Sequence, residues 1–184
     1  MAAGGTPGNV TLGPGRLYYA PLGTTEPTSC SAALPSAWKV IGYTEEGTEV
    51  STDLTVEDIE VAEELDPIDQ LMTKRTTTVT FTMVEATAAR LALAMGSGAA
   101  RADDASSFEF PDSLTAVMLV WDSTDSPDAT NRRWVFRQCK PQGTVAMARR
   151  KAPQKTGIAV TMACAKPDST TAAVKVFPNS SGRV

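Results

Sequence analysis

Alternation of apolar and polar side chains runs through this chain and directs it toward a β-rich fold. Within residues 76–84, Val79, Phe81 and Met83 alternate with threonines, and residues 157–165 repeat the pattern with apolar side chains at every second position. Each stretch predicts a strand with one buried face and one polar face, since successive side chains of a strand point to opposite sides. We therefore expect a mainly β fold, a sandwich or a barrel-like sheet.

Further strands are predicted where apolar residues run together. Residues 116–121 form a continuous apolar run of strand length, which predicts a central strand covered on both faces. In residues 132–140, strict alternation places Trp134 and Phe136 on one face and Val135 and Cys139 on the other. Shorter candidate strands are residues 16–20, 38–44, 56–62 and 172–177.

One segment is typical of a short α-helix. Thr87 is a good N-cap, residues 88–95 are nearly all strong helix formers, and Gly96 stands where a C′ glycine ends a helix. We expect this helix to flank the sheet with the stripe formed by Ala88, Leu91, Ala92 and Met95.

Charge is distributed unevenly along the chain. Residues 1–73 carry two basic and twelve acidic side chains, residues 74–130 carry four and eight, and residues 131–184 carry eleven and one. Oppositely charged segments on opposite faces would favour head-to-tail association between copies. The same distribution of charges would also arise if the acidic and basic segments were adjacent strands that neutralise one another within a monomer. The sequence leaves both interpretations open.

Residues 44–73, here called the acidic arm, do not fit an ordinary compact sandwich. These thirty residues hold eleven carboxylates, no basic side chain and one short strand signal at residues 56–62. A long excursion without a core of its own is usually functional or disordered, and the aliphatic content argues against disorder. We interpret the acidic arm as a projecting loop whose partners lie on another subunit. The interface candidates are Val56, Ile59, Val61, Glu63, Glu64, Leu65, Asp66, Ile68, Asp69 and Leu71, together with the basic turn Arg149, Arg150 and Lys151.

Motifs for catalysis are incomplete. The chain has no histidine, which excludes serine–histidine and cysteine–histidine nucleophile pairs. Ser36 and Lys39 have an S-x-x-K spacing and residues 155–157 read K-T-G, but the S-D-N element that accompanies them in penicillin-binding enzymes is missing. We expect ordinary turn and strand roles for these residues, and we predict no catalytic residue.

No cofactor, metal or membrane anchor is predicted either. The chain has no phosphate-binding glycine motif and no run of eighteen apolar residues. Carboxylates at residues 63–69 could hold a divalent cation, but a solvated acidic turn is the favoured interpretation. The three cysteines show no paired spacing, and we expect reduced, mostly buried thiols.

Four stretches carry a resemblance to a known family. They are GRLYYAPLGTTEPT at residues 15–28, WKVIGYTEEGTEVS at 38–51, ELDPIDQLMTKRTTTVTFTMVEAT at 64–87 and RLALAMG at 90–96. In their order and spacing they resemble the major tail proteins, or tail tube proteins, of long-tailed bacteriophages that infect actinobacteria. The similarity covers most of the first hundred residues and consists of many ordinary residues rather than a catalytic signature.

The resemblance implies a fold, an assembly and a set of partners. The fold would be a small β-sandwich with one flanking helix and a long extended loop: a flexible N-terminal arm at residues 1–15, one domain at 16–178 and a C-terminal tail at 179–184. Six copies would form a ring, each giving four strands to a continuous inner barrel, and stacked rings would form a hollow tube. Such a protein would be made in the host cytoplasm and would reside in the virion. Its partners would be its own copies, the tape measure and tail terminator proteins, and double-stranded DNA passing without sequence recognition.

Alternatives from other classes are kept beside this interpretation. A neck or tail-completion ring protein would share the β-rich fold but stop at single rings. A non-phage β-sandwich binding module would present an aromatic groove, and the three Trp and three Tyr residues mostly occupy core-like strand positions. An enzyme is the least favoured class, because no catalytic set is complete.

Overall fold

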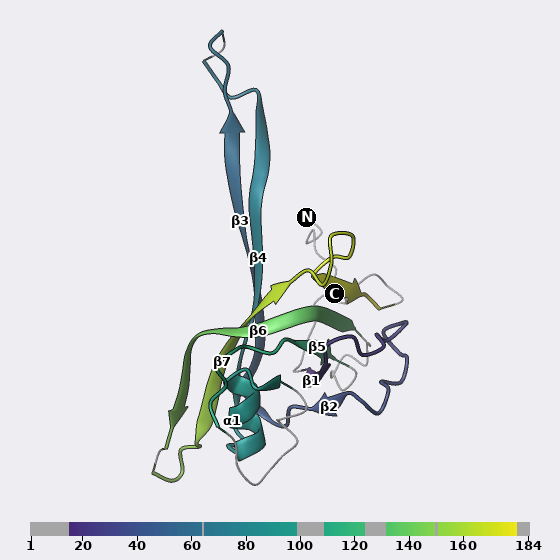
Figure 1. Ribbon diagram of the computed structural model, residues 1–184, viewed down its shortest axis with the longest axis vertical. Helices are drawn as coiled ribbons and strands as arrows, with labels where there is room; N and C mark the ends of the chain where they lie inside the picture. The colour runs from purple at the N-terminus through teal and green to yellow at the C-terminus, as the bar shows by residue number, and fades with distance from the viewer. Residues whose placement is uncertain (1–14, 64, 99–108, 124–131, 150, 180–184) are drawn as a thin grey trace, which may run out of the picture.

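The computed structural model describes residues 15–63, 65–98, 109–123, 132–149 and 151–179. The described part is mainly β, with one short helix (Figure 1). Its elements are β1 (Arg16–Pro21), β2 (Lys39–Val40), β3 (Thr44–Ile59), β4 (Asp69–Met83), α1 (Ala88–Ala94), β5 (Val117–Asp122), β6 (Arg133–Ala148), β7 (Gly157–Ala165) and β8 (Val174–Phe177). The mainly β fold with a short flanking helix, predicted from alternation, is confirmed.

All described strands belong to one antiparallel sheet. The strand order is β2-β1-β5-β6-β7-β4-β3, and β8 pairs with β6 beside the end of β7. This single sheet curves, most visibly along β6 (Figure 1). Between Gln142 and Ala146 the β6–β7 register shifts, and Gly143 there has a φ of 71°, a left-handed conformation that glycine adopts without strain.

Two apolar clusters lie on opposite faces of the central strand β5. On one face, Leu119 packs with buried side chains from β1, β4, β6, β7 and α1, including Phe81 and Phe136. On the other face, Val120 packs with Trp38 and Val135. The prediction of a central strand covered on both sides is confirmed, and its alternate side chains serve two different clusters.

The assignment of Cys139 to the same face as Val135 was wrong. Val117 pairs with Cys139 and Leu119 pairs with Phe136, so β6 carries an extra residue in this interval. A β-bulge of this kind shifts the alternation by one position. Cys139 therefore joins Phe136 in the larger cluster, while Val135 faces the smaller one.

Helix α1 begins and ends at the predicted residues but buries a different surface. The Thr87 hydroxyl accepts a hydrogen bond from the Arg90 amide, and Gly96 follows with a φ of 82°. The buried residues are Ala92, Leu93 and Ala94, so Ala92 is the one member of the predicted stripe that is fully buried, and Leu91 packs partly buried against the larger cluster. Burial is concentrated at the C-terminal end, where Leu93 and Ala94 join the larger apolar cluster.

Candidate assembly surfaces

The acidic arm forms β3, the tip and the first five residues of β4 in a long β-hairpin, rather than a loop with one short strand. β3 and β4 have 16 and 15 residues and pair from Thr44↔Met83 to Ile59↔Asp69. The hairpin extends far from the rest of the molecule (Figure 1). The prediction of a strand at residues 56–62 alone was wrong in extent, because the outer strands are exposed on both faces and lack the one-sided alternation that marks a half-buried strand.

Polar side chains connect the two strands of this hairpin. The hydroxyls of Ser51 and Thr78 lie 2.7 Å apart, and those of Thr52 and Thr77 lie 3.1 Å apart. Nearer the tip, the Gln70 side chain donates to Asp58 over 2.8 Å. Cross-strand polar pairs of this kind add to the backbone ladder. They account for an extended ribbon that carries no core of its own.

Apolar side chains are exposed along the outer hairpin, defined here as residues 52–63 and 65–75. Val56 and Met72 are directly paired, with 47% and 51% of their surfaces exposed, and Leu54, 59% exposed, lies on the same face two residues from Val56. The predicted residues Ile59, Leu65, Ile68 and Leu71 are also exposed, whereas Val61 is half-buried. Leu54 and Met72 were missed by the sequence analysis, although Leu54 stands two residues before the predicted Val56 and so shares its face.

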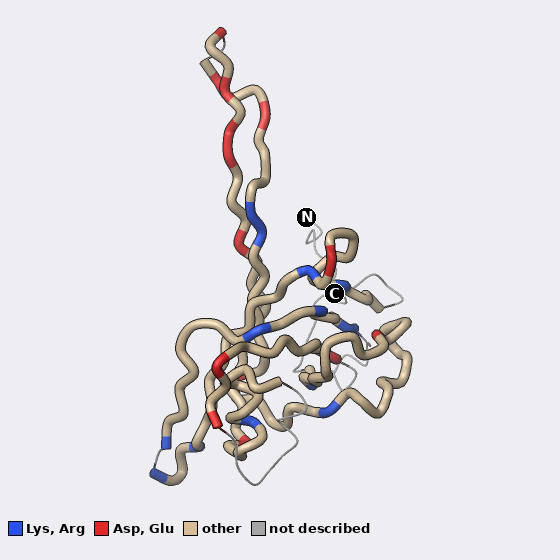
Figure 2. Tube along the Cα trace, viewed as in Figure 1, with Lys and Arg blue, Asp and Glu red and all other residues tan. Residues whose placement is uncertain are grey.

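Acidic residues are spread along the outer hairpin, where these apolar residues also lie (Figure 2). Glu63, Asp66 and Asp69, three of the predicted interface residues, are exposed near the tip. Glu64 lies outside the described residues. Because these groups extend into solvent without basic neighbours until Lys74, the outer hairpin presents a negative surface with apolar side chains in it.

The basic turn lies at the opposite end of the same sheet. Arg149 and Lys151 are exposed in the connection between β6 and β7, and Arg150 lies outside the described residues. β4 pairs with β7 from Thr77↔Cys164 to Met83↔Ile158. Before Thr77, β4 extends away from β7 toward the hairpin tip. Ile158, at the other end of this pairing, lies next to the start of β7 and so close to the basic turn. Fifteen residues of β4 span roughly 46 Å at about 3.3 Å each. The outer hairpin therefore lies too far from the basic turn for the two to neutralise each other within one monomer, and Figure 2 shows these charges at opposite ends. The first residues of the acidic arm lie at the basic end, because Thr44 pairs with Met83.

Besides the short strands β2 and β8, two longer edges of the sheet lack a neighbour among the described strands. β3 pairs with β4 alone. Cys139 of β6 pairs with Val117 of β5 on one side and with Cys164 of β7 on the other. The pairing with β5 ends at Cys139. Among the described strands, residues 140–148 of β6 therefore pair only with β7. An open edge offers unpaired backbone groups to another chain. The four strands β3, β4, β7 and the second half of β6 thus form a sheet with an open edge on each side.

The outward face of these four strands is rich in hydroxyl groups. Thr80 of β4 and Thr161 of β7 are register partners whose hydroxyls lie 3.2 Å apart, and Ser51 and Thr78 pair beside them. The buried neighbours Val79 and Phe81 point to the other side. The predicted division of residues 76–84 into an apolar and a hydroxyl-rich face is confirmed.

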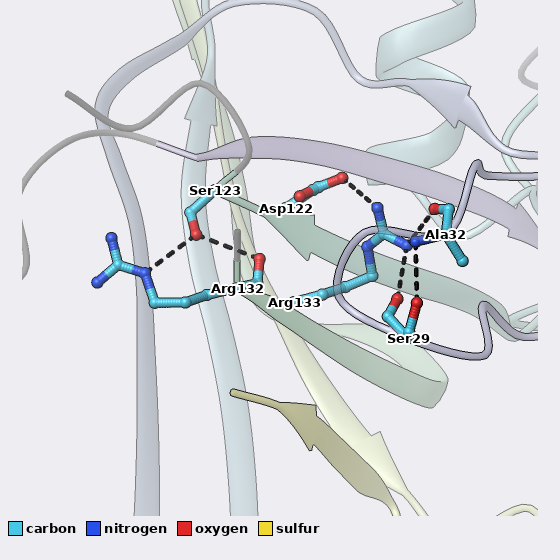
Figure 3. Close-up of polar contacts among 6 residues, drawn as sticks. All are labelled: Ser29, Ala32, Asp122, Ser123, Arg132 and Arg133. Carbon is cyan, nitrogen blue, oxygen red and sulfur yellow. Dashed lines mark hydrogen bonds and ion pairs between the residues drawn. The ribbon is translucent and has the colours of Figure 1, made fainter. Parts of the chain in front are cut away.

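A buried ion pair fixes the long connection between β1 and β2 against the sheet (Figure 3). Arg133 donates to Asp122 over 2.6 Å, and the two side chains are only 4% and 7% exposed. The same guanidinium donates to the carbonyl oxygens of Ser29 and Ala32 over 3.1 and 2.7 Å. Beside it, Arg132 Nε donates to Ser123 Oγ. Sequence analysis did not identify this cluster as structural.

A second ion pair holds the same connection closer to β8. Arg137 binds the Glu26 carboxylate through two nitrogens, one of them at 3.0 Å, and donates to the Ala172 carbonyl oxygen at 2.7 Å. The hydrogen bond from Arg137 lowers the pKa of Glu26 below its ordinary value, against an opposing effect of partial burial. Both ion pairs fix the β1–β2 connection, because each guanidinium binds a carboxylate and at least one backbone carbonyl oxygen.

Neither a metal cluster nor a membrane span emerges from the part of the chain that the structure describes. No group of three or more Cys, Asp or Glu side chains is placed there to hold a metal ion. Within the same ranges, no helix has the length and apolar character to cross a membrane. The surfaces with unused binding capacity are the outer hairpin, the basic turn and the two open edges.

Comparison with known proteins identifies one similar family. The model of a family described as phage tail tube protein matches residues 5–174 of the chain. No curated protein matches the chain. The matched region includes every strand that forms the open-edged sheet and the hairpin.

Proposed function

Because this chain belongs to the phage tail tube protein family, we propose that six copies form a ring and that rings stack into a tube that conducts the genome. Tail tube proteins are structural components of the virion tail, and self-association is their central property. The observation that carries the proposal is the disposition of three features on one sheet: two open lateral edges, an acidic hairpin at one end and a basic turn at the other. An actinobacterial host, implied by the sequence resemblance, is part of the proposal.

Ring closure would use the two open edges. β3 of one copy would pair with residues 140–148 of β6 in the next copy, so that each subunit contributes four strands. Twenty-four strands at about 4.8 Å spacing and ~40° tilt give a backbone circumference of roughly 150 Å and a diameter near 48 Å. After side chains are subtracted, about 35 Å is left, which exceeds the ~20 Å width of a DNA duplex.

Stacking would use the two ends of the sheet. The outer hairpin of one ring would lie against the adjacent ring, where Leu54, Val56 and Met72 lose contact with water. Its carboxylates would approach the positive end that holds Arg149 and Lys151 in the neighbouring ring. A heterologous contact of this kind repeats from ring to ring and generates a filament.

The proposed partners follow from the tube. Double-stranded DNA and a length-determining tape measure protein would pass through the lumen, and a tail terminator protein would cap the last ring. The hydroxyl-rich face with Thr80 and Thr161 is mostly neutral and wettable, and the charged residues Glu49 and Lys140 that share it by register are of opposite sign. Such a wall would let DNA slide, because strong phosphate binding requires Lys or Arg.

Electron microscopy of the purified full chain tests this function. We expect open-ended tubes with six-fold symmetric end views and a central channel. Single rings that never elongate would favour a neck or tail-completion protein, and a monomer at all concentrations would contradict the proposal.

A shortened hairpin sharpens the test. Thr55 pairs with Lys74, so replacing residues 56–73 by an Asn-Gly turn joins the two strands at that pair, in the length that two-residue hairpins use. The strand residues removed are exposed, so the core and the melting temperature should be retained. We expect this variant to lose tube formation. Normal tubes from it would show that the outer hairpin has been misassigned.

A further inference from the structure

Cys139 and Cys164 face each other across two neighbouring strands. They are direct register partners in the β6–β7 ladder, and their sulfur atoms lie 3.4 Å apart. Residues directly opposite in antiparallel strands have Cα atoms about 4.5–5.5 Å apart, which lies within the range that a disulfide spans. The third cysteine, Cys30, lies in the connection between β1 and β2.

The two thiols differ in access to solvent. Cys139 is fully buried in the larger apolar cluster, whereas Cys164 is partly exposed. The hydrogen bond with Cys164 and, next, burial raise the pKa of Cys139 well above its ordinary value. Cys164 is therefore the thiol that an oxidant in solution meets first, and Cys139 is the resolving thiol behind it.

A hollow next to Cys164 offers an approach for such an oxidant. It has a volume of about 420 Å³, and its lining includes Lys74, Arg75 and Lys166 in addition to Cys164. Three cationic side chains attract an anionic molecule. Oxidised glutathione is a low-molecular-weight disulfide with a net negative charge, and it has the reactive bond that thiol exchange needs.

We propose that Cys139 and Cys164 form a redox-sensitive pair that closes to an intramolecular disulfide by exchange with an anionic low-molecular-weight disulfide. The Cys164 thiolate attacks one sulfur of oxidised glutathione, forms a mixed disulfide and releases one glutathione thiolate. Cys139, after its proton passes to water, attacks the Cys164 sulfur and releases the second glutathione thiolate. The two protein thiols lose two electrons and two protons, and the glutathione disulfide gains them as two thiols.

Closure would fix β6 to β7 at the point where β6 leaves β5. Val117↔Cys139 is the last β5–β6 pair, so the link would lie where the body passes into the open-edged sheet. Disulfides persist outside reducing compartments, and a virion released from its host is in such surroundings. This inference goes beyond the proposed assembly and does not depend on it, because the reaction lies within one chain.

The test treats the purified full chain with oxidised glutathione, before and after assembly. We expect free thiols to fall from three to one per chain, a mass lower by two hydrogen atoms, and a linked peptide pair containing Cys139 and Cys164. The melting temperature should rise by roughly 5–10 °C, since the link closes a loop of about 25 residues.

Matched variants separate the pair from the other cysteine. Cys30→Ser should behave as the wild type, and Cys164→Ala, at a partly exposed position, should remain folded and lose the response. Three persistent thiols in the treated wild type would overturn the proposal, as would a stable glutathione adduct on Cys164 or a crosslink through Cys30. If the Cys139–Cys164 disulfide forms but the chain does not form tubes, that result would contradict the proposed tube assembly and leave the redox proposal standing.

Discussion

Arg133 and Asp122 form an ion pair at 2.6 Å that is almost completely withdrawn from solvent. The two residues are register partners across β5 and β6, at the end of both strands. From this position the Arg133 guanidinium also binds two carbonyl oxygens of the β1–β2 connection. The pair therefore links the central strands to a long segment that covers the smaller apolar cluster.

Replacing Arg133 tests the importance of this link. Arg133→Met retains the aliphatic part of the side chain but leaves the Asp122 carboxylate without its 2.6 Å partner, so we expect the free energy of unfolding to fall by about 3–5 kcal/mol. Urea denaturation followed by tryptophan fluorescence measures the change. Lys140→Met, an exposed position on the same strand, is the control and should change stability by at most about 0.5 kcal/mol. Equal effects of the two substitutions would contradict the structural role.

Acid stability should depend on Glu26. Its pKa is lowered in the folded state, so ionised Glu26 stabilises the fold at neutral pH, and this contribution is lost as the pH falls below the ordinary value of 4.5 and through the folded value. Glu26→Gln should reduce stability by about 0.5–1 kcal/mol at pH 7, because the pair is partly exposed. The difference from the wild type should shrink toward zero in strong acid. A constant difference between pH 7 and pH 2 would show that charge is not the cause.

Strand positions with one buried face were predictable because burial imposes alternation. Val79, Phe81 and Met83 illustrate this, and the structure buries all three. Residues 45–55 of β3 escaped prediction for the converse reason, because most of their side chains are exposed and no one-sided alternation marks them. Pairing with β4 gives this segment its strand conformation. The face of Cys139 depended on a bulge, which local sequence does not mark.

The ion pairs were beyond sequence analysis for a different reason. Glu26 and Arg137 are 111 residues apart, and only the tertiary fold brings them together. The interface candidates were accessible to sequence analysis because a long acidic stretch with aliphatic side chains and no basic residue is unusual in a compact domain. That these candidates lie at the opposite end of the sheet from the basic turn could be established only from the β4–β7 register in the structure.

The apolar face of the outer hairpin should matter for assembly and not for folding. Leu54, Val56 and Met72 share one face and are about half exposed, so changing all three to serine should move the melting temperature of the unassembled chain by less than about 2 °C. In the proposed tube each of them would be buried, at up to about 1.5–3 kcal/mol per side chain, so tube yield should fall sharply. Sedimentation and electron microscopy measure the yield.

The opposite face of the same hairpin supplies the matched control. Ile59 and Leu71 lie on that face, because Ile59 is an odd number of residues from Val56 and Leu71 adjoins Met72. Changing both to serine should reduce tube yield less than the triple change does. The reverse ranking would show that the other face of the hairpin contacts the adjacent ring.

Charge at the two ends of the sheet should control stacking. If the acidic hairpin of one ring meets the basic turn of the next, the combined change Arg149→Glu, Arg150→Glu and Lys151→Glu places like charges together and should block elongation of a folded subunit. An exposed pair contributes only about 0.2–1 kcal/mol, but every copy in every ring repeats it. Elongation of the wild type should also weaken with salt, because exposed charges are screened beyond about 8 Å at physiological ionic strength.

Compensating charge reversals in the acidic arm distinguish a specific contact between rings from a general effect of net charge. Adding Glu63→Lys, Glu64→Lys, Asp66→Lys and Asp69→Lys to the reversed chain should restore part of the tube yield, since opposite charges would again face each other across rings. Lys39→Glu, an exposed change on β2 at the other edge of the sheet, is the control and should leave elongation intact. Light scattering follows elongation, and melting curves verify that each subunit is folded. Normal elongation of the reversed chain, with or without the compensating lysines, would mean that the segregated charge serves solubility and that apolar contacts alone hold the rings together.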